Sequence, residues 1–243
     1  MTKLRFLNSN AVKFLAAILM VIDHVGLLFF PYDMVFRYIG RLSMPLFAFA
    51  VSEGCRYTKN KVKHLALLSG LALLCQIVYF VTMESLYMCI LVTFSLSVVT
   101  IYALQFCKRT LFGENGILQK TLSVLLFAAC VGGVYFLCKV LTIDYGFWGC
   151  MMPVFASLLD FRGVENVPTW LQKADCLPAR VLTMAVGVFL LYTFEPFCGY
   201  WALCAIPLLL LYNGEKGKWN TKYFFYIFYP THLVLLQAIF WLL

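Results

Sequence analysis

Four titratable side chains stand inside two apolar stretches near the N-terminus, where charge is costly. Asp23 and His24 are neighbours in the first stretch, and Arg37 and Arg41 are four residues apart in the second. A titratable residue inside a membrane span usually faces a cavity or a partner, so each is a candidate site residue. Histidine is the side chain most readily poised as a base near neutral pH, and arginines suit an oxyanion or a phosphate.

The same residues also allow a structural interpretation. An ion pair between Asp23 and Arg41 would hold the first two helices together, and His24 would then only be hydrogen-bonded inside the bundle. Depth favours the functional interpretation. His24 lies about 20 Å above the inner end of its helix, and Arg41 lies about 7 Å below the outer end of the next helix, so the two residues are at the same depth in the membrane. One layer in the outer leaflet is therefore expected to hold the Asp-His pair and the arginines.

A second group of candidates is expected on the cytoplasmic side of the membrane. Lys13 precedes His24 on nearly the same helix face, roughly 16 Å below it. The Gly-rich turn 212–218 carries Asn213, Lys216 and Lys218. Backbone N–H groups and lysines in such a turn suit phosphates, although a plain positive-inside loop accounts for the same residues.

Four more polar residues are weaker candidates, namely Glu53, Asp144, Tyr229 and His232. For Glu53 and His232, a structural role inside the bundle explains the residue equally well. His232 follows Tyr229 and Pro230 about 12 Å from the cytoplasmic end of its helix, where proline kinks the helix and frees a carbonyl. Asp144 opens a short span among aromatic residues that also fit an interfacial belt. No Cys or His spacing typical of a metal site occurs, and we expect no metal ion.

The elements that must position these side chains are transmembrane helices. Of the 243 residues, 63% are apolar or aromatic and 12% are charged, and the mean hydropathy is +0.87. Soluble domains have about 45–50% apolar and about 25% charged residues, and a soluble core of this size cannot bury so much apolar surface. The sequence therefore predicts an all-α, polytopic helix bundle in a membrane, as one domain over residues 1–243. The ten cysteines are expected to be mainly small buried hydrophobes.

The sequence contains about nine apolar stretches that are candidate membrane spans, and the expected number of spans is about eight to ten. They cover approximately residues 11–30, 36–55, 63–83, 86–107, 119–140, 145–160, 179–195, 199–213 and 223–242. The sixth and eighth are short, so either can be re-entrant. All but three of the 19 lysines and arginines fall on one side of this arrangement, which predicts a cytoplasmic N-terminus. Topology thus accounts for the net charge of +8, and nucleic acid is not expected as a partner.

Five sequence blocks follow one another from the first span to the last: IDHVG (22–26), RYIGRLSMPLFAFAVSEG (37–54), DYGFWG (144–149), YNGEKG (212–217) and FYIFYPTHL (225–233). Together they resemble the TraX family of integral-membrane acetyltransferases, typified by the enzyme that acetylates the N-terminus of conjugative F-type pilin. A wider superfamily of membrane acyltransferases, which O-acetylate bacterial polysaccharides, separates a basic residue from a first-span histidine by ten residues. Lys13 and His24 resemble that spacing, with lysine in place of arginine.

The resemblance implies acetyl-CoA, or another acyl-CoA, as a co-substrate taken from the cytoplasm. The acyl group would pass to an amine or hydroxyl at the outer face of a bacterial cytoplasmic membrane. His24 would remove the acceptor's proton, Arg37 or Arg41 would stabilise the tetrahedral oxyanion, and Lys13 with the 212–218 turn would meet the CoA phosphates. The acceptor stays open between a protein N-terminus, a glycan and a lipid-linked precursor.

Two other functions fit the same residues. A transporter for a small anion or a lipid-linked precursor also places histidines and arginines inside the membrane, although no inverted repeat is detected. A scaffold or assembly subunit would need none of the charges in the outer layer. Acyl-CoA-dependent labelling of an acceptor separates the acyltransferase from both alternatives.

Overall fold

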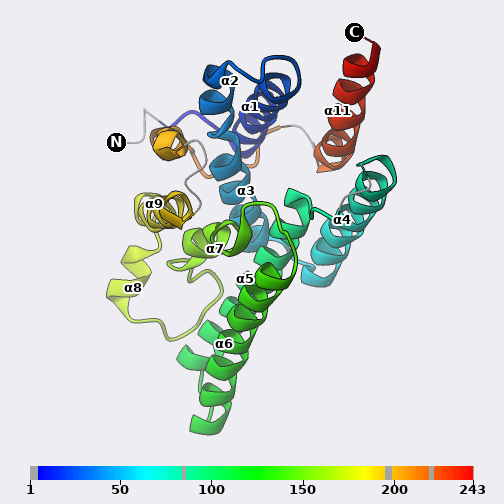
Figure 1. Cartoon of the computed structure of the whole chain (residues 1–243). Helices are drawn as coiled ribbons and strands as arrows, with labels where there is room; N and C mark the ends of the chain where they lie inside the picture. The colour runs from blue at the N-terminus through cyan, green and yellow to red at the C-terminus, as the bar shows by residue number, and fades with distance from the viewer. Residues whose placement is uncertain (1–4, 84–85, 195–198, 219–221, 243) are drawn as a thin grey trace. The chain divides into compact units, whose positions relative to one another are not determined.

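Helices make up most of the chain in the computed structural model, which describes residues 5–83, 86–194, 199–218 and 222–242 (Figure 1). Over these ranges there is no strand, only the isolated bridges Leu7–Tyr212 and Met88–Ile143. Within these ranges, six helical stretches are long and apolar enough to cross a membrane: Ser9–Phe29, Met34–Tyr57, Lys61–Phe80, Ile90–Phe112, Ile117–Val140 and Leu177–Phe194. The prediction of an all-α, polytopic membrane bundle is confirmed, whereas the number of spans and the cytoplasmic N-terminus stay predictions.

The chain divides into two compact units, here called the first unit (residues 1–50 and 196–243) and the second unit (residues 51–195). The first unit contains α1 (Ser9–Phe29), α2 (Met34–Gly40), the beginning of α3 (Ser43–Tyr57), the 3-10 helix η2 (Gly199–Cys204), α10 (Ala205–Leu210) and α11 (Lys222–Leu242). The second unit contains the rest of α3, α4 (Lys61–Met83), α5 (Ile90–Phe112), α6 (Ile117–Val140), α7 (Gly146–Ser157), α8 (Thr169–Ala174) and α9 (Leu177–Phe194). The expectation of a single domain over residues 1–243 stays a prediction.

Two glycines let α1 and α2 pack with their backbones unusually close. A Cβ atom on Gly40 would overlap the Cα and Cβ of Asp23, and a Cβ atom on Gly26 would overlap the Cβ of Phe36. Such contacts are open only to glycine, which has no side chain to displace. The close approach brings Asp23 of α1 directly against α2.

The second predicted span, 36–55, forms two helices rather than one. α2 ends at Gly40 and α3 begins at Ser43, with Arg41 and Leu42 between them. Pro45 explains the interruption, because proline has no N–H for the carbonyl of Arg41 and its ring crowds that carbonyl. Proline is tolerated here because it falls in the first turn of α3, where its N–H would have no partner anyway.

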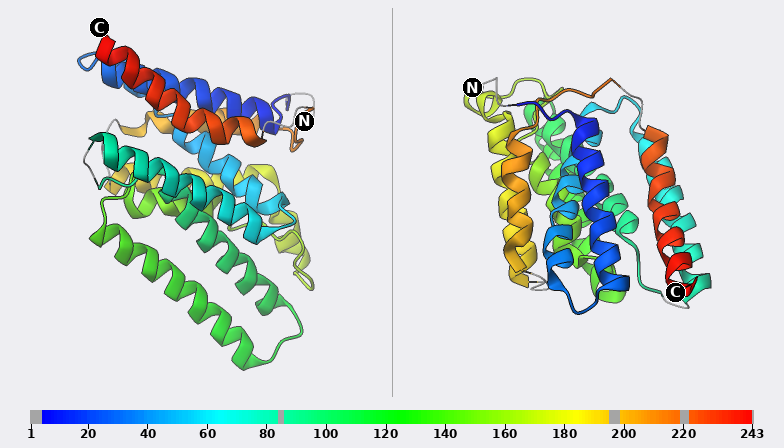
Figure 2. Two further views of the ribbon diagram at one scale, coloured as in Figure 1. Left: turned by 90° about the vertical axis from the view of Figure 1, so that its right-hand side faces the viewer. Right: turned by 90° about the horizontal axis from the view of Figure 1, so that it is seen from above.

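The first and last helices of the chain run side by side in the same direction (Figure 2). Near their N-terminal ends, Phe14 contacts Phe224 and Phe225, with ring centroids 5.3 and 5.1 Å apart. Towards their C-terminal ends, Phe29 meets Phe240 at 6.0 Å. If both helices cross the membrane, their parallel direction requires an odd number of crossings from α1 to α11, counting both.

In the second unit, the short helix α7 is buried against α5 and α9. Cys150, Met152 and Ala156 on α7 are fully buried, as are Val98 on α5 and Val188 on α9. Twelve residues of α-helix extend about 18 Å, which is too short for a hydrocarbon core of about 30 Å. The sixth predicted span is therefore a helix that cannot cross the bilayer alone, and the eighth is divided between η2 and α10.

Candidate active site

His24 lies on α1 with one ring nitrogen committed to its own helix. Its Nδ1 is 2.7 Å from the carbonyl oxygen of Met20. Because a carbonyl only accepts hydrogen bonds, Nδ1 carries the proton and donates it. Nε2 is left as the basic nitrogen, so the geometry suits the base role predicted for His24.

His232 on α11 lies against His24. The two imidazole centroids are 5.2 Å apart, with the rings edge to face at 79°. His232 repeats the arrangement of His24, because its Nδ1 lies 3.0 Å from the carbonyl oxygen of Phe228, and its ring stacks on the Phe228 ring. Tyr229 meets the His232 ring edge to face at 5.6 Å. The structure thus brings His24 together with Tyr229 and His232, which the sequence analysis placed in a different group of candidates.

Asp23 forms its ion pair with Arg37. Nη1 of Arg37 lies 2.7 Å from Oδ2 of Asp23 and 3.4 Å from the Asp23 carbonyl oxygen, and both side chains are more than four-fifths buried. The pair joins α1 to α2 at the point where Gly40 permits close contact. Arg41, the partner considered from the sequence, is 6% exposed at the end of α2.

The predicted phosphate-binding residues also come together, at the N-terminal end of α1. Residues 211–215 attach to the start of the chain through backbone hydrogen bonds from Leu7 to Leu211, from Ser9 to Glu215 and from Asn213 to Leu7. Gly217 packs on Asn8 and Asn10, and both Gly214 and Gly217 have positive φ, which favours glycine.

At this end of α1, the lysines supply positive charge, whereas the Asn213 side chain is hydrogen-bonded within the turn. The Lys13 and Lys216 ammonium groups lie close enough to repel each other, and Lys216 and Lys218 are exposed. The Asn213 side chain is used within the turn, where it bonds the backbone N–H and the carboxylate of Glu215. An anion bound here would relieve the repulsion between the lysines.

Asp144 and Glu53 belong to the second unit, where each has a partner. Tyr87 donates its hydroxyl to Asp144 at 2.6 Å, next to the Met88–Ile143 bridge. Glu53 forms an ion pair with Arg180 at 2.6 Å, with both side chains about 5% exposed.

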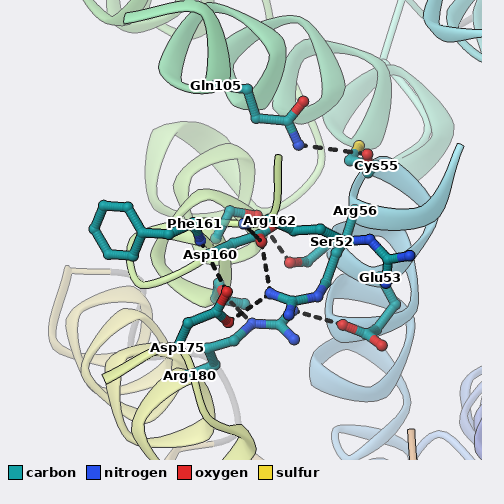
Figure 3. Close-up of polar contacts among 12 residues, drawn as sticks. Ser52, Glu53, Cys55, Arg56, Gln105, Asp160, Phe161, Arg162, Asp175 and Arg180 are labelled. Carbon is teal, nitrogen blue, oxygen red and sulfur yellow. Dashed lines mark hydrogen bonds and ion pairs between the residues drawn. The ribbon is translucent and has the colours of Figure 1, made fainter. Parts of the chain in front are cut away.

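The Glu53–Arg180 pair is part of a buried charge network (Figure 3). Arg56 binds Asp160 at 2.5 Å and Asp175 at 2.6 Å, joining α3 to the chain that follows α7 and α8. The carboxylates also accept backbone N–H groups of residues 161 and 162. Opposite charges are therefore paired, as buried charges must be, and the two contacts of Arg56 are also hydrogen bonds.

Lys108 of α5 completes this region by capping the C-terminal end of α7. Its ammonium group donates to the carbonyl oxygens of Ser157, Leu158 and Asp160 at 2.8, 2.7 and 2.9 Å. A cation is favoured at a helix C-terminus, where carbonyl groups lack partners. All three N–H donors of the ammonium are used, which gives Lys108 a structural role.

Sequence reasoning missed this network, apart from Glu53. The sequence pattern gives no role to Arg56, Asp160, Asp175 or Arg180. The available signal was that Glu53 and Arg180 carry opposite charges at the same predicted end of two spans. His64 was also missed; its Nδ1 lies 2.7 Å from the Tyr102 hydroxyl.

No metal site accompanies these groups in the part of the chain that the structure describes. There, no set of three or more His, Cys, Asp and Glu side chains is arranged to hold an ion.

Comparison with known proteins identifies the family. The family model described as TraX protein matches residues 8–240. This chain belongs to the TraX family. The TraX match spans both units and includes His24, His232 and the 212–218 turn, and it confirms the resemblance inferred from the five sequence blocks.

A curated relative of this TraX protein comes from Dichelobacter nodosus. It is described as "Probable fimbrial assembly protein FimC, serogroup H1" and is 27% identical over 244 aligned residues, covering 93% of this chain and 92% of the relative. No solved structure matches the chain.

Proposed function

We propose that this protein is a membrane acyltransferase that moves an acetyl or other acyl group from cytoplasmic acyl-CoA to an amine or hydroxyl at the outer face. The observation that carries the proposal is the tautomer of His24. Its Nδ1–H is held by the Met20 carbonyl, so Nε2 is available as a base inside a membrane protein of the TraX family. The expected location is a bacterial cytoplasmic membrane.

The chemistry requires one proton to move twice. Nε2 of His24 takes a proton from the acceptor as the acceptor's nitrogen or oxygen attacks the thioester carbon. The tetrahedral intermediate then expels the CoA thiolate, and His24 returns the proton to that sulfur. A guanidinium group of Arg37 or Arg41 stabilises the oxyanion, and Asp23 holds Arg37 in place.

The cytoplasmic end of α1 supports the acyl-CoA part of the proposal. Lys13, Lys216 and the backbone of the 212–218 turn offer positive charge and N–H groups for phosphates. Lys13 and His24 are about 16 Å apart along α1, a separation that the extended pantetheine arm of CoA would bridge.

The acceptor class has support from the relative alone. Because the relative is described as a fimbrial assembly protein, a protein N-terminus is the preferred acceptor over a glycan or a lipid-linked precursor. We therefore take an amine as the first acceptor to test.

The deciding experiment is acetyl-CoA turnover by the purified protein in nanodiscs. His24→Ala should lower CoA release by about 10²- to 10⁴-fold, the usual contribution of a general base. The matched control is His64→Ala, which removes a histidine bound to Tyr102 in the second unit and should leave turnover unchanged. Turnover by His24→Ala within about threefold of the unmodified protein would exclude the base role.

Failure of the unmodified protein to bind or use acetyl-CoA would direct the test to longer acyl-CoAs. If these also failed, the acyltransferase proposal would be wrong and transport would take its place.

A further inference from the structure

His232 has a basic nitrogen that nothing satisfies among the described residues. The residue is only 7% exposed, yet its Nε2 has no hydrogen-bond partner there. Its Nδ1 is used by the Phe228 carbonyl and its ring is fixed by stacking on Phe228, 9° from parallel. A buried acceptor without a donor is costly, so this position calls for a polar group that brings its own hydrogen.

His24 offers the same kind of acceptor next to it. In both histidines Nδ1 donates to the carbonyl four residues earlier, which leaves Nε2 as a lone-pair acceptor in each ring. Two neutral acceptors cannot hydrogen-bond to each other. With the rings 5.2 Å apart, a single small molecule that has two hydrogens can donate to both.

We propose that His232 accepts a hydrogen bond from the acceptor nucleophile and holds it against His24. The inference rests on the proposed acyltransferase function. In a neutral amine, one N–H faces His24, the other faces His232, and the lone pair faces the thioester carbon. The first proton passes to His24 as the C–N bond forms; the C–S bond then breaks and that proton goes to the thiolate. His232 gains no proton and keeps the second hydrogen bond.

Two substitutions separate this role from packing. His232→Phe keeps an aromatic ring for Phe228 but has no acceptor atom. His232→Gln keeps an acceptor oxygen near the place of Nε2 but loses the ring. CoA release is measured in nanodiscs with butylamine as the amine probe and acetyl-CoA as the donor.

His232→Phe should lower kcat/KM for butylamine by about tenfold or more, the effect of one lost hydrogen bond in a buried site. Its KM for acetyl-CoA should not change. His232→Gln should keep kcat/KM within about threefold of the unmodified protein. The control is Phe240→Leu, which weakens another ring contact between α1 and α11 and should leave both constants unchanged.

The possible failures are distinct. No CoA release by the unmodified protein would overturn the proposed function and this inference with it. An active protein whose His232→Phe variant keeps its kcat/KM would overturn only the role of His232. Equal losses in His232→Phe and His232→Gln, with equally lowered thermal midpoints, would assign His232 to packing and would also overturn the inference.

Discussion

At the scale of single residues, one backbone carbonyl decides which nitrogen of His24 can act as a base. The Met20 carbonyl oxygen accepts the hydrogen of Nδ1, so Nε2 is the nitrogen that carries the lone pair. The sequence predicts a functional role for His24, because an Asp-His pair inside an apolar stretch is uncommon and costly. It does not predict the tautomer, because the hydrogen bond depends on the rotamer of one side chain.

The Asp23–Arg37 ion pair can be tested by a double-mutant cycle. Asp23→Asn and Arg37→Gln should each lower the free energy of unfolding by about 1–3 kcal/mol, because each removes the ion pair between two largely buried side chains. The double variant should lose less than the sum of the two. Its CoA release should stay low, because the Arg37 charge is missing. Unfolding in detergent measures the stabilities, and additive losses would contradict a coupled pair.

The sequence analysis considered Arg41 as the ion-pair partner of Asp23, whereas the structure pairs Asp23 with Arg37. Spacing places the two arginines on one helix face, so both satisfy the periodicity argument equally. The choice of Arg37 follows from how close α1 and α2 come, which is set by Gly26 and Gly40. Which arginine pairs with Asp23 is therefore determined by the packing of α1 against α2.

At the scale of elements, the α1–α2 contact gives a sharp test of these glycines. Gly40→Ala places a methyl group on Asp23 and should destabilise the protein by about 1–3 kcal/mol, the usual cost of overpacking. It should also lower CoA release, because Asp23 and Arg37 are displaced. Gly70→Ala on α4 is the control, because no atom lies within 4 Å of the added methyl group.

Thermal unfolding in detergent and CoA release measure both variants. We expect Gly70→Ala to be neutral or stabilising by up to about 1 kcal/mol, as alanine favours helix over glycine. A Gly40→Ala variant as stable as Gly70→Ala would mean that α1 and α2 can separate without cost.

The contact between His24 and His232 shows that depth in the membrane cannot be obtained by counting residues from the helix ends alone. Counting from the helix ends predicts different depths for the two histidines, about 20 and about 12 Å. Their rings nevertheless touch, because α1 and α11 are staggered: Phe14, near the start of α1, already lies beside Phe224 and Phe225. Hydrophobic periodicity locates a helix, but the axial offset between two helices is set by side chains that meet only in the fold.

At the scale of the whole molecule, the parallel course of α1 and α11 gives a test of topology. A phosphatase that is active only outside the cytoplasm can be fused after residue 243 or inserted in the 212–218 turn. If α11 crosses the membrane outward, the fusion after residue 243 should be active and the insertion inactive. The same activity at both positions would contradict a crossing by α11 and the predicted odd number of spans.

Composition predicts the membrane fold well, because the apolar fraction leaves no soluble alternative. The positions of the apolar stretches also agree with the helices, apart from the interruption at Arg41 and Leu42, the shortness of α7 and the division of the eighth stretch between η2 and α10. The buried network around Arg56 was not predicted, because Asp160 lies at the end of a predicted span and Asp175 in a predicted loop, where charged residues are ordinary. Charges in loops acquire partners through tertiary contacts, which no local pattern encodes.

The first unit joins the beginning of the chain to its end, and this has a consequence for biosynthesis. A ribosome completes His24 long before His232, so the two imidazoles cannot meet until α11 has been made. Unfinished chains would carry a base without its neighbour. In the proposed mechanism, the order of synthesis therefore keeps His232 from holding an acceptor against His24 until α11 is in place.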